Sequence, residues 1–228
     1  MNNNIEIVKN EVIKLLKDDN SGHGIDHINR VTNISIKIAE KEQANKELVT
    51  VIARLHDVDD YKLFSIENEE NLSNTTKILE KTSYTIEQKK IIINSIKTIG
   101  YSKRLEGIIP QNIEAKIVSD ADMIESMGAI GILRTFQYNI KNNNPFFDRD
   151  KFPRLDMSAS EYKNAKDGTS VNHLFEKILK LKAFMLTEYG KKEATKRTDF
   201  IINFLKEYFY EEDVPEWIDY LNNYIEKA

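Results

Sequence analysis

The stretch HINRVTNISIKI (His27–Ile38) shows how this chain folds. Its apolar residues return every three or four positions, at Val31, Ile34 and Ile38, and His27 falls on the same stripe. This spacing is typical of an amphipathic helix whose apolar face packs against a core. The stretch therefore predicts a helix that carries an imidazole into the protein interior.

The same period recurs along the chain, which has only 8 glycines and 4 prolines in 228 residues. No alternation of apolar and polar residues extends beyond a few positions, so we expect no sheet. The sequence predicts an all-helical (all-α) fold. We place about nine or ten helices at roughly 5–16, 22–41, 46–57, 67–81, 85–99, 113–127, 129–141, 171–188, 191–211 and 216–226.

We expect a single domain over residues 1–228, with a core at about 21–130 and a helical extension at about 131–228. The least regular segment, at about 142–170, carries two of the prolines and many turn-forming residues. Long loops in compact domains are often functional. This segment is therefore either a lid over a site or a plain connector.

Composition narrows the function classes. The net charge is −4 and no long block of Lys and Arg occurs, so the basic face of a duplex nucleic-acid binder is not expected. The chain has no cysteine, which excludes thiolate catalysis and cysteine-bound metals. Charges interrupt the apolar N-terminal segment, and no run reaches the roughly 18 apolar residues of a membrane span. We expect a cytoplasmic protein with no membrane partner.

Two further helices carry polar groups on their apolar faces. His56 continues the stripe of the helix at about 46–57, and Asp120 lies between Ile117 and Ile124 on the stripe of a later helix. A lone buried carboxylate is very costly, so it must be paired, protonated or bound to a metal. Asp57, beside His56 at a helix end, adds one more donor.

The inward groups His27, His56, Asp57 and Asp120 form a set of nitrogen and oxygen donors without sulfur. Such a set suits a divalent ion such as Mn²⁺, Fe²⁺, Co²⁺, Ni²⁺ or Zn²⁺. Four protein ligands leave one or two positions of an octahedral ion for water and a substrate oxygen. The alternatives are hydrogen-bonded core histidines, and an Asp120 that caps a helix or pairs with Arg30.

The candidate ligands lie in three stretches, GHGIDHINRV (Gly22–Val31), ARLHDVDDYK (Ala53–Lys62) and KIVSDADMIESMGAIGILRTF (Lys116–Phe136). These stretches resemble the HD superfamily, and the tail Asn172–Arg197 is similar to its bacterial YpgQ-like branch. Two positions depart from the family pattern. His23 is followed by Gly24 where the family often has Asp or Ser, and Met123 stands where Arg is common.

The resemblance implies an all-helical bundle around one metal held by His27, His56, Asp57 and Asp120. It also implies metal-dependent nucleotide pyrophosphohydrolase activity, with manganese favoured and Fe, Co, Ni, Zn or Mg as alternatives. No histidine lies between Asp57 and His173. HD proteins with two metals insert extra histidines in that interval, so we expect a mononuclear site.

Several other residues are candidates for catalysis. Asp60 or Asp59 is expected to assist with the proton of the attacking water, or to orient an imidazole. Two adjacent acids can equally form a solvated turn. His23 is a candidate phosphate contact or general acid, and the alternative is a helix cap. Asp122 lies two positions after Asp120 and is expected to point away from the site, in a structural role.

Candidate substrate-binding residues are Arg30 at the pocket rim, Lys62, and the pair His173 and Lys177 on one helix face. We predict hydrolysis of nucleoside triphosphates to monophosphate and pyrophosphate. The alternatives are a phosphomonoesterase on nucleoside monophosphates, an alarmone hydrolase, a nucleotide-binding regulatory module and a purely structural helical protein. The expected partner is a small phosphorylated compound, and the oligomeric state stays open, with a dimer among the possibilities.

Overall fold

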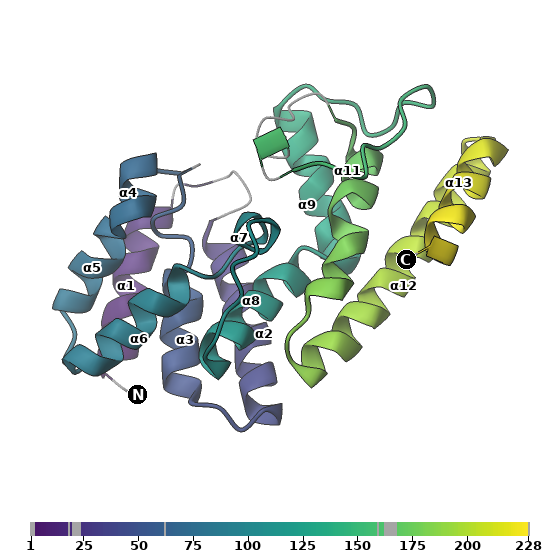
Figure 1. Cartoon of the computed structure of the whole chain (residues 1–228). Helices are drawn as coiled ribbons and strands as arrows, with labels where there is room; N and C mark the ends of the chain where they lie inside the picture. The colour runs from purple at the N-terminus through teal and green to yellow at the C-terminus, as the bar shows by residue number, and fades with distance from the viewer. Residues whose placement is uncertain are drawn as a thin grey trace. The chain divides into compact units, whose positions relative to one another are not determined.

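The structure, a computed structural model, describes residues 3–17, 19, 24–61, 63–158, 160–161 and 168–227. Within these ranges the chain is helical and has no strand (Figure 1), which confirms the all-α prediction. None of the helices in these ranges combines the length and the apolar character needed to cross a membrane.

The chain separates into two compact units, residues 1–125 with 186–190 and residues 126–185 with 191–228. The first unit contains α1 (Asn3–Leu16), α2 (Ile25–Lys41), α3 (Lys46–Leu55), α4 (Ile66–Asn71), α5 (Ser73–Glu80), α6 (Ile86–Ile96), α7 (Tyr101–Leu105) and α8 (Ile113–Glu125). The second contains α9 (Gly128–Lys141), α11 (Ser170–Glu176), the 3₁₀ helix η1 (Ile178–Phe184), most of α12 (Glu188–Glu211) and α13 (Pro215–Lys227).

The core of the first unit is the contact between α2, α3 and α8, each of which touches the other two. Helix α3 is buried on most of its surface, with Val49, Ile52 and Leu55 fully enclosed. It begins where the Asn45 side chain accepts hydrogen bonds from the backbone N–H groups of Glu47 and Leu48, which satisfies donors that the first helical turn leaves open. The packing of these three helices against one another positions the side chains at their ends.

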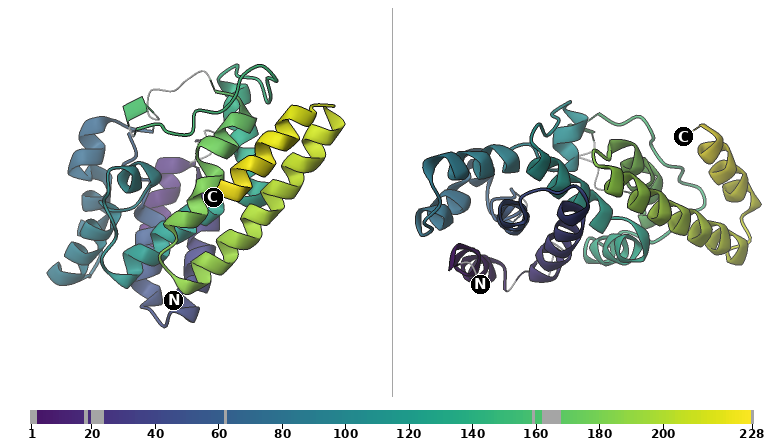
Figure 2. Two further views of the ribbon diagram at one scale, coloured as in Figure 1. Left: turned by 45° about the vertical axis from the view of Figure 1, so that its right-hand side comes forward. Right: turned by 90° about the horizontal axis from the view of Figure 1, so that it is seen from below.

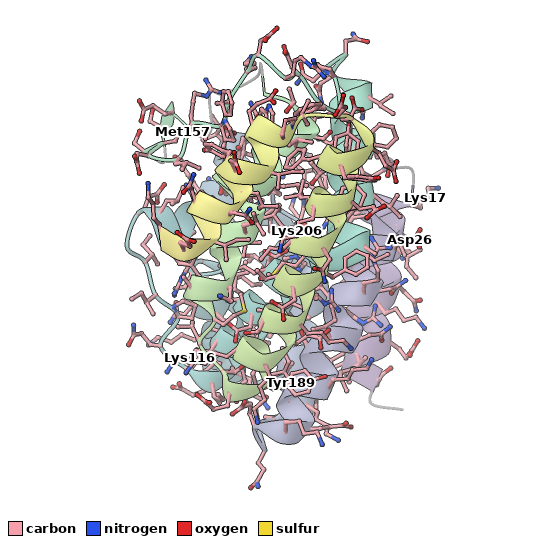
Figure 3. The ribbon with its side chains drawn as sticks, turned by 90° about the vertical axis from the view of Figure 1, so that its right-hand side faces the viewer. Lys17, Asp26, Lys116, Met157, Tyr189 and Lys206 are labelled. Atoms are coloured by element: carbon pink, nitrogen blue, oxygen red, sulfur yellow. The ribbon has the colours of Figure 1, made fainter. Side chains whose placement is uncertain are left out.

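The second unit has an aromatic core around Trp217. The Trp217 ring stacks on Phe152 at a centroid distance of 4.5 Å, and Phe147 lies edge-on to it at 5.0 Å. Helices α12 and α13 run side by side, as Figures 2 and 3 show. The Trp217 indole N–H donates to the carbonyl of Arg149. The first part of the irregular segment is therefore packed against α13, while residues 159 and 162–167 lie outside the described ranges.

The helices differ most from the predictions at three places. The predicted helix at 67–81 is two helices, because Leu72 adopts the left-handed conformation with φ 47° between α4 and α5. The helix predicted at 171–188 ends at Glu176 and continues as η1. The short helix α7 was not predicted. The predicted start near Gly22 lies outside the described residues, and the single-domain boundaries stay a prediction.

Candidate metal centre

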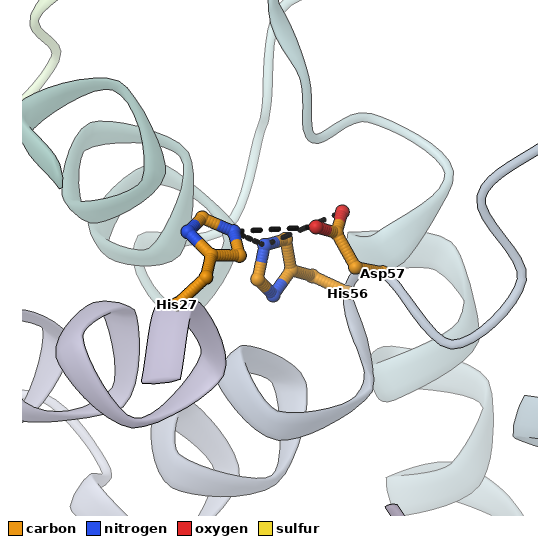
Figure 4. Close-up of side chains that lie close together, drawn as sticks. All are labelled: His27, His56 and Asp57. Carbon is orange, nitrogen blue, oxygen red and sulfur yellow. Dashed lines mark hydrogen bonds and ion pairs between the residues drawn. The ribbon is translucent and has the colours of Figure 1, made fainter. Parts of the chain in front are cut away.

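Two buried imidazoles face each other inside the first unit. His27 lies in the first turn of α2, and His56 is the residue that ends α3. Their side chains are 2% and 1% exposed, and their Nε2 atoms are 3.2 Å apart (Figure 4). The contact between α2 and α3 brings the two rings together across 29 positions of sequence.

Two carboxylates lie beside these nitrogens. Asp57 Oδ2 is 3.2 Å from His27 Nε2, and Asp57 Oδ1 is 3.4 Å from His56 Nε2. Asp122, from α8, places Oδ1 3.7 Å and 3.8 Å from the same two nitrogens. Donor atoms of His27, His56 and Asp57 all lie within 4.8 Å of one another. The carboxylates are more exposed than the imidazoles, at 13% for Asp57 and 22% for Asp122, so they form the open side of the cluster.

The surroundings of the outer ring nitrogens show that this donor set fits a cation. His56 Nδ1–H donates to the carbonyl of Ala53 at 2.7 Å, and His27 Nδ1 lies 3.0 Å from Glu125 Oε2. The hydrogen bond to Ala53 holds the ring proton of His56 on Nδ1, so its Nε2 presents a lone pair toward His27 Nε2 and the Asp57 carboxylate. A lone pair and a carboxylate that face the same point are donors that a bound cation would hold together. Nitrogen and oxygen donors of this kind suit a divalent metal ion.

The structure places Asp122, and not Asp120, beside the two imidazoles. The Asp120 side chain is fully buried and accepts hydrogen bonds from Leu186 N–H at 2.9 Å, Thr187 N–H at 2.8 Å and the Thr187 hydroxyl at 2.7 Å. Burial raises the pKa of the Asp120 carboxyl, and these hydrogen bonds oppose that shift. Asp120 therefore anchors the segment Leu186–Gly190. Asp122, which was expected from its spacing to point away, lies at the imidazoles.

Asp59 also has a different place from the one expected. It is buried, and its two carboxylate oxygens accept hydrogen bonds from the backbone N–H groups of Asn74 and Thr75, at 2.7 and 2.9 Å. These are orphan donors at the start of α5, so Asp59 caps that helix from a distance. Asp60 is half-buried, and its proton-transfer role stays a prediction.

Glu125 is a residue of the site that was not predicted from the sequence. It ends α8, its side chain is 1% exposed, and Oε1 accepts a hydrogen bond from Arg30 Nε at 2.8 Å. Arg30 therefore engages a protein carboxylate, and its contact with substrate stays a prediction. The available signal was the spacing of Asp122 and Glu125, because residues three apart share one face of a helix.

The remaining candidates have no established place at the site. His23 and Lys62 lie outside the described residues. His173 is in α11 and Lys177 follows that helix, both in the second unit. The α-helix ends at Glu176, and the Lys177 N–H still donates to the carbonyl of His173 at 3.1 Å. Their binding of substrate stays a prediction.

Comparisons with known proteins identify the family. A family model described as the HD domain matches residues 24–127. A crystal structure of an HD-superfamily hydrolase from Bacillus thuringiensis is 31% identical, with a TM-score of 0.71 over 92% of this chain and 96% of that one. A Lactobacillus plantarum protein is 29% identical, with a TM-score of 0.82 over 93% and 98%.

YpgQ from Bacillus subtilis is also similar. The two sequences are 27% identical over 213 residues, which are 92% of this chain and 93% of YpgQ. Its crystal structure in complex with ADP has a TM-score of 0.68, at 22% identity over 91% of this chain and 94% of that chain. This likeness extends the shared fold across both units.

Proposed function

The chain belongs to the HD superfamily and is a metal-dependent hydrolase, and from this premise we propose that it hydrolyses nucleoside triphosphates to monophosphate and pyrophosphate. The observation that carries the proposal is the convergence of His27 Nε2, His56 Nε2 and the Asp57 carboxylate on one point. The ADP bound in the YpgQ crystal structure supports a nucleotide as the substrate class.

We assign the metal ligands as His27, His56, Asp57 and Asp122, with manganese as the ion. A divalent ion held there supplies positive charge against the developing oxyanion and activates water for attack on phosphorus. The chain's own part is positioning. Its buried imidazoles fix one side of the site, and the more exposed carboxylates leave the other side open to a phosphate group.

Asp60 is the remaining candidate for the proton of the attacking water. Its neighbour Asp59 uses both carboxylate oxygens on the start of α5. Asp60 follows Asp57 by three positions, its N–H donates to the carbonyl of Asp57 at 3.2 Å, and it is not fully buried. A carboxylate near the reacting water can accept its proton.

A product assay tests the proposal. The Mn²⁺-loaded protein is incubated with nucleoside triphosphates and monophosphates, and the products are separated. We expect monophosphate and pyrophosphate from the triphosphates. His56→Ala should lower turnover by about 1000-fold, because several kcal/mol of metal-derived stabilisation are lost. Asn33→Ala, an exposed change on α2, is the matched control.

Other outcomes contradict the substrate assignment in distinct ways. Orthophosphate released from monophosphates would indicate a phosphomonoesterase. Turnover restricted to compounds with a 3′-diphosphate would indicate an alarmone hydrolase. Bound Mn²⁺ without turnover of any triphosphate would rule out the proposed reaction.

A further inference from the structure

We propose that Glu125 is a positioning residue of the metal centre, which holds His27 in the tautomer that directs Nε2 toward the ion, and that Arg30 holds Glu125 in place. This inference rests on the proposed metal site and adds to it two residues that do not touch the ion. The three residues come from two helices, His27 and Arg30 from α2 and Glu125 from α8.

The Glu125 carboxylate lies between the Arg30 guanidinium and the His27 ring. Glu125 Oε1 accepts from Arg30 Nε at 2.8 Å, and Glu125 Oε2 lies 3.0 Å from His27 Nδ1. His27 and Arg30 are three positions apart, so both lie on the side of α2 that meets α8. A carboxylate buried to this degree is stable only with partners of this kind.

The consequence for the metal centre lies in the imidazole. A carboxylate opposite Nδ1 keeps the ring proton on that nitrogen and leaves the lone pair on Nε2. That Nε2 atom is 3.2 Å from His56 Nε2 and 3.2 Å from Asp57 Oδ2. Without the carboxylate, the proton can move to Nε2, where it would block the ligand position.

The change Glu125→Gln distinguishes control of the His27 tautomer from a purely structural contact between α2 and α8. A carboxylate can accept from two donors, whereas an amide offers one carbonyl oxygen and one NH₂ group. The cationic Arg30 competes more strongly for the carbonyl oxygen. The NH₂ group then faces His27 Nδ1 and favours the opposite tautomer. If Arg30 is also replaced by Met, the amide is free to turn its oxygen toward His27.

The first measurement is Mn²⁺ affinity by calorimetry for the full chain, without substrate. We expect Glu125→Gln to weaken binding by about 10–100-fold, the range for residues that orient metal ligands. The double variant Glu125→Gln with Arg30→Met should recover most of that loss. Glu114→Gln, on the same helix and half-buried, is the matched control and should bind as the wild type does.

The second measurement is the ¹⁵N signals of the histidine rings in the metal-free protein, assigned with His27→Gln. We expect the Nδ1–H tautomer of His27 in the wild type, the Nε2–H tautomer in Glu125→Gln, and a return to Nδ1–H in the double variant. An unchanged tautomer together with affinity within about twofold of the wild type would overturn the proposal. A double variant that binds Mn²⁺ more weakly than Glu125→Gln would also overturn the proposal. A purely structural contact between α2 and α8 would be weakened further by each substitution.

The two proposals fail in different ways. Wild-type protein that binds no Mn²⁺ or other divalent ion contradicts the metal ligands assigned under the proposed function. The tautomer of His27 in the metal-free protein still decides the role of Glu125 in that case.

Discussion

Asp120 and Asp122 stand two positions apart on α8 and belong to two different regions of the first unit. Asp120 accepts hydrogen bonds from neutral donors of the segment Leu186–Gly190. Asp122 lies beside the Nε2 atoms of His27 and His56, at 3.7 and 3.8 Å. A buried carboxylate surrounded by N–H and O–H donors has its hydrogen-bonding capacity satisfied without a metal ion. A carboxylate that lies beside imidazole nitrogens has the surroundings of a metal ligand, and this contrast separates a structural acid from a candidate ligand.

Of the substitutions that test this contrast, Asp122→Asn should have the largest effect on Mn²⁺ affinity and turnover. Loss of one charged ligand should lower Mn²⁺ affinity by more than about 100-fold, and turnover should fall by about 1000-fold. The unfolding free energy of the metal-free protein should stay within about 1 kcal/mol of the wild type, because the side chain is partly exposed. Calorimetry and chemical denaturation measure the two quantities. Wild-type affinity in this variant would return Asp122 to the structural role that the sequence suggested.

The next effect should come from Asp120→Asn. The amide NH₂ would face backbone N–H donors, so we expect a loss of about 2–4 kcal/mol in unfolding free energy. Gly190→Ala tests the same pocket without changing its charge, because a Cβ atom there would overlap Asp120 Oδ2. Both variants should keep one bound Mn²⁺ per chain with nearly native affinity. If Asp120→Asn abolished metal binding while the protein stayed folded, Asp120 would be a ligand.

The smallest effect should come from Asp59→Asn, a third acid in the same unit. One of the two N–H donors at the start of α5 would lose its acceptor, at a cost of about 1 kcal/mol. Because the carboxylate is used as a cap, turnover should remain close to the wild-type value. A thermal melt and the product assay distinguish the two roles. A large loss of turnover with an unchanged melting temperature would identify Asp59 as the proton acceptor.

The two histidines and Asp57 could be predicted from the sequence because α2 and α3 have clear apolar stripes. Helix α8 lacks a clear contrast between a buried apolar face and an exposed polar face. Asp120, Met123, Ile124 and Glu125 are all buried, so polar groups on opposite sides of this helix are equally interior. Periodicity identified Asp120 as inward-facing, and it is. Its donors lie 66 and 67 positions away, in a segment whose approach to α8 no local pattern shows.

The fold class could likewise be predicted from periodicity, whereas the interruptions could not. Leu72 breaks the predicted helix at 67–81 in a conformation that leucine rarely adopts, and its side chain is 4% exposed. Burial of that side chain favours the break, and this tertiary contact leaves no mark in the local sequence. Capping motifs are easier to recognise in the sequence than such interruptions. Thr85 and Gln88 form a reciprocal capping box at the start of α6, where a helix was predicted to begin.

The hydrogen bonds between the segment Leu186–Gly190 and Asp120 limit where this chain can be truncated. The backbone leaves the first unit after Glu125, returns for five residues, and leaves again after Gly190. A chain truncated at residue 125 would keep the Asp120 carboxylate but lose every donor named for it above. Neither unit is therefore encoded by one continuous stretch of sequence that could be expressed by itself. An autonomous version of the metal-binding half would require the Leu186–Gly190 segment to be supplied, either as a peptide or through a redesigned linker.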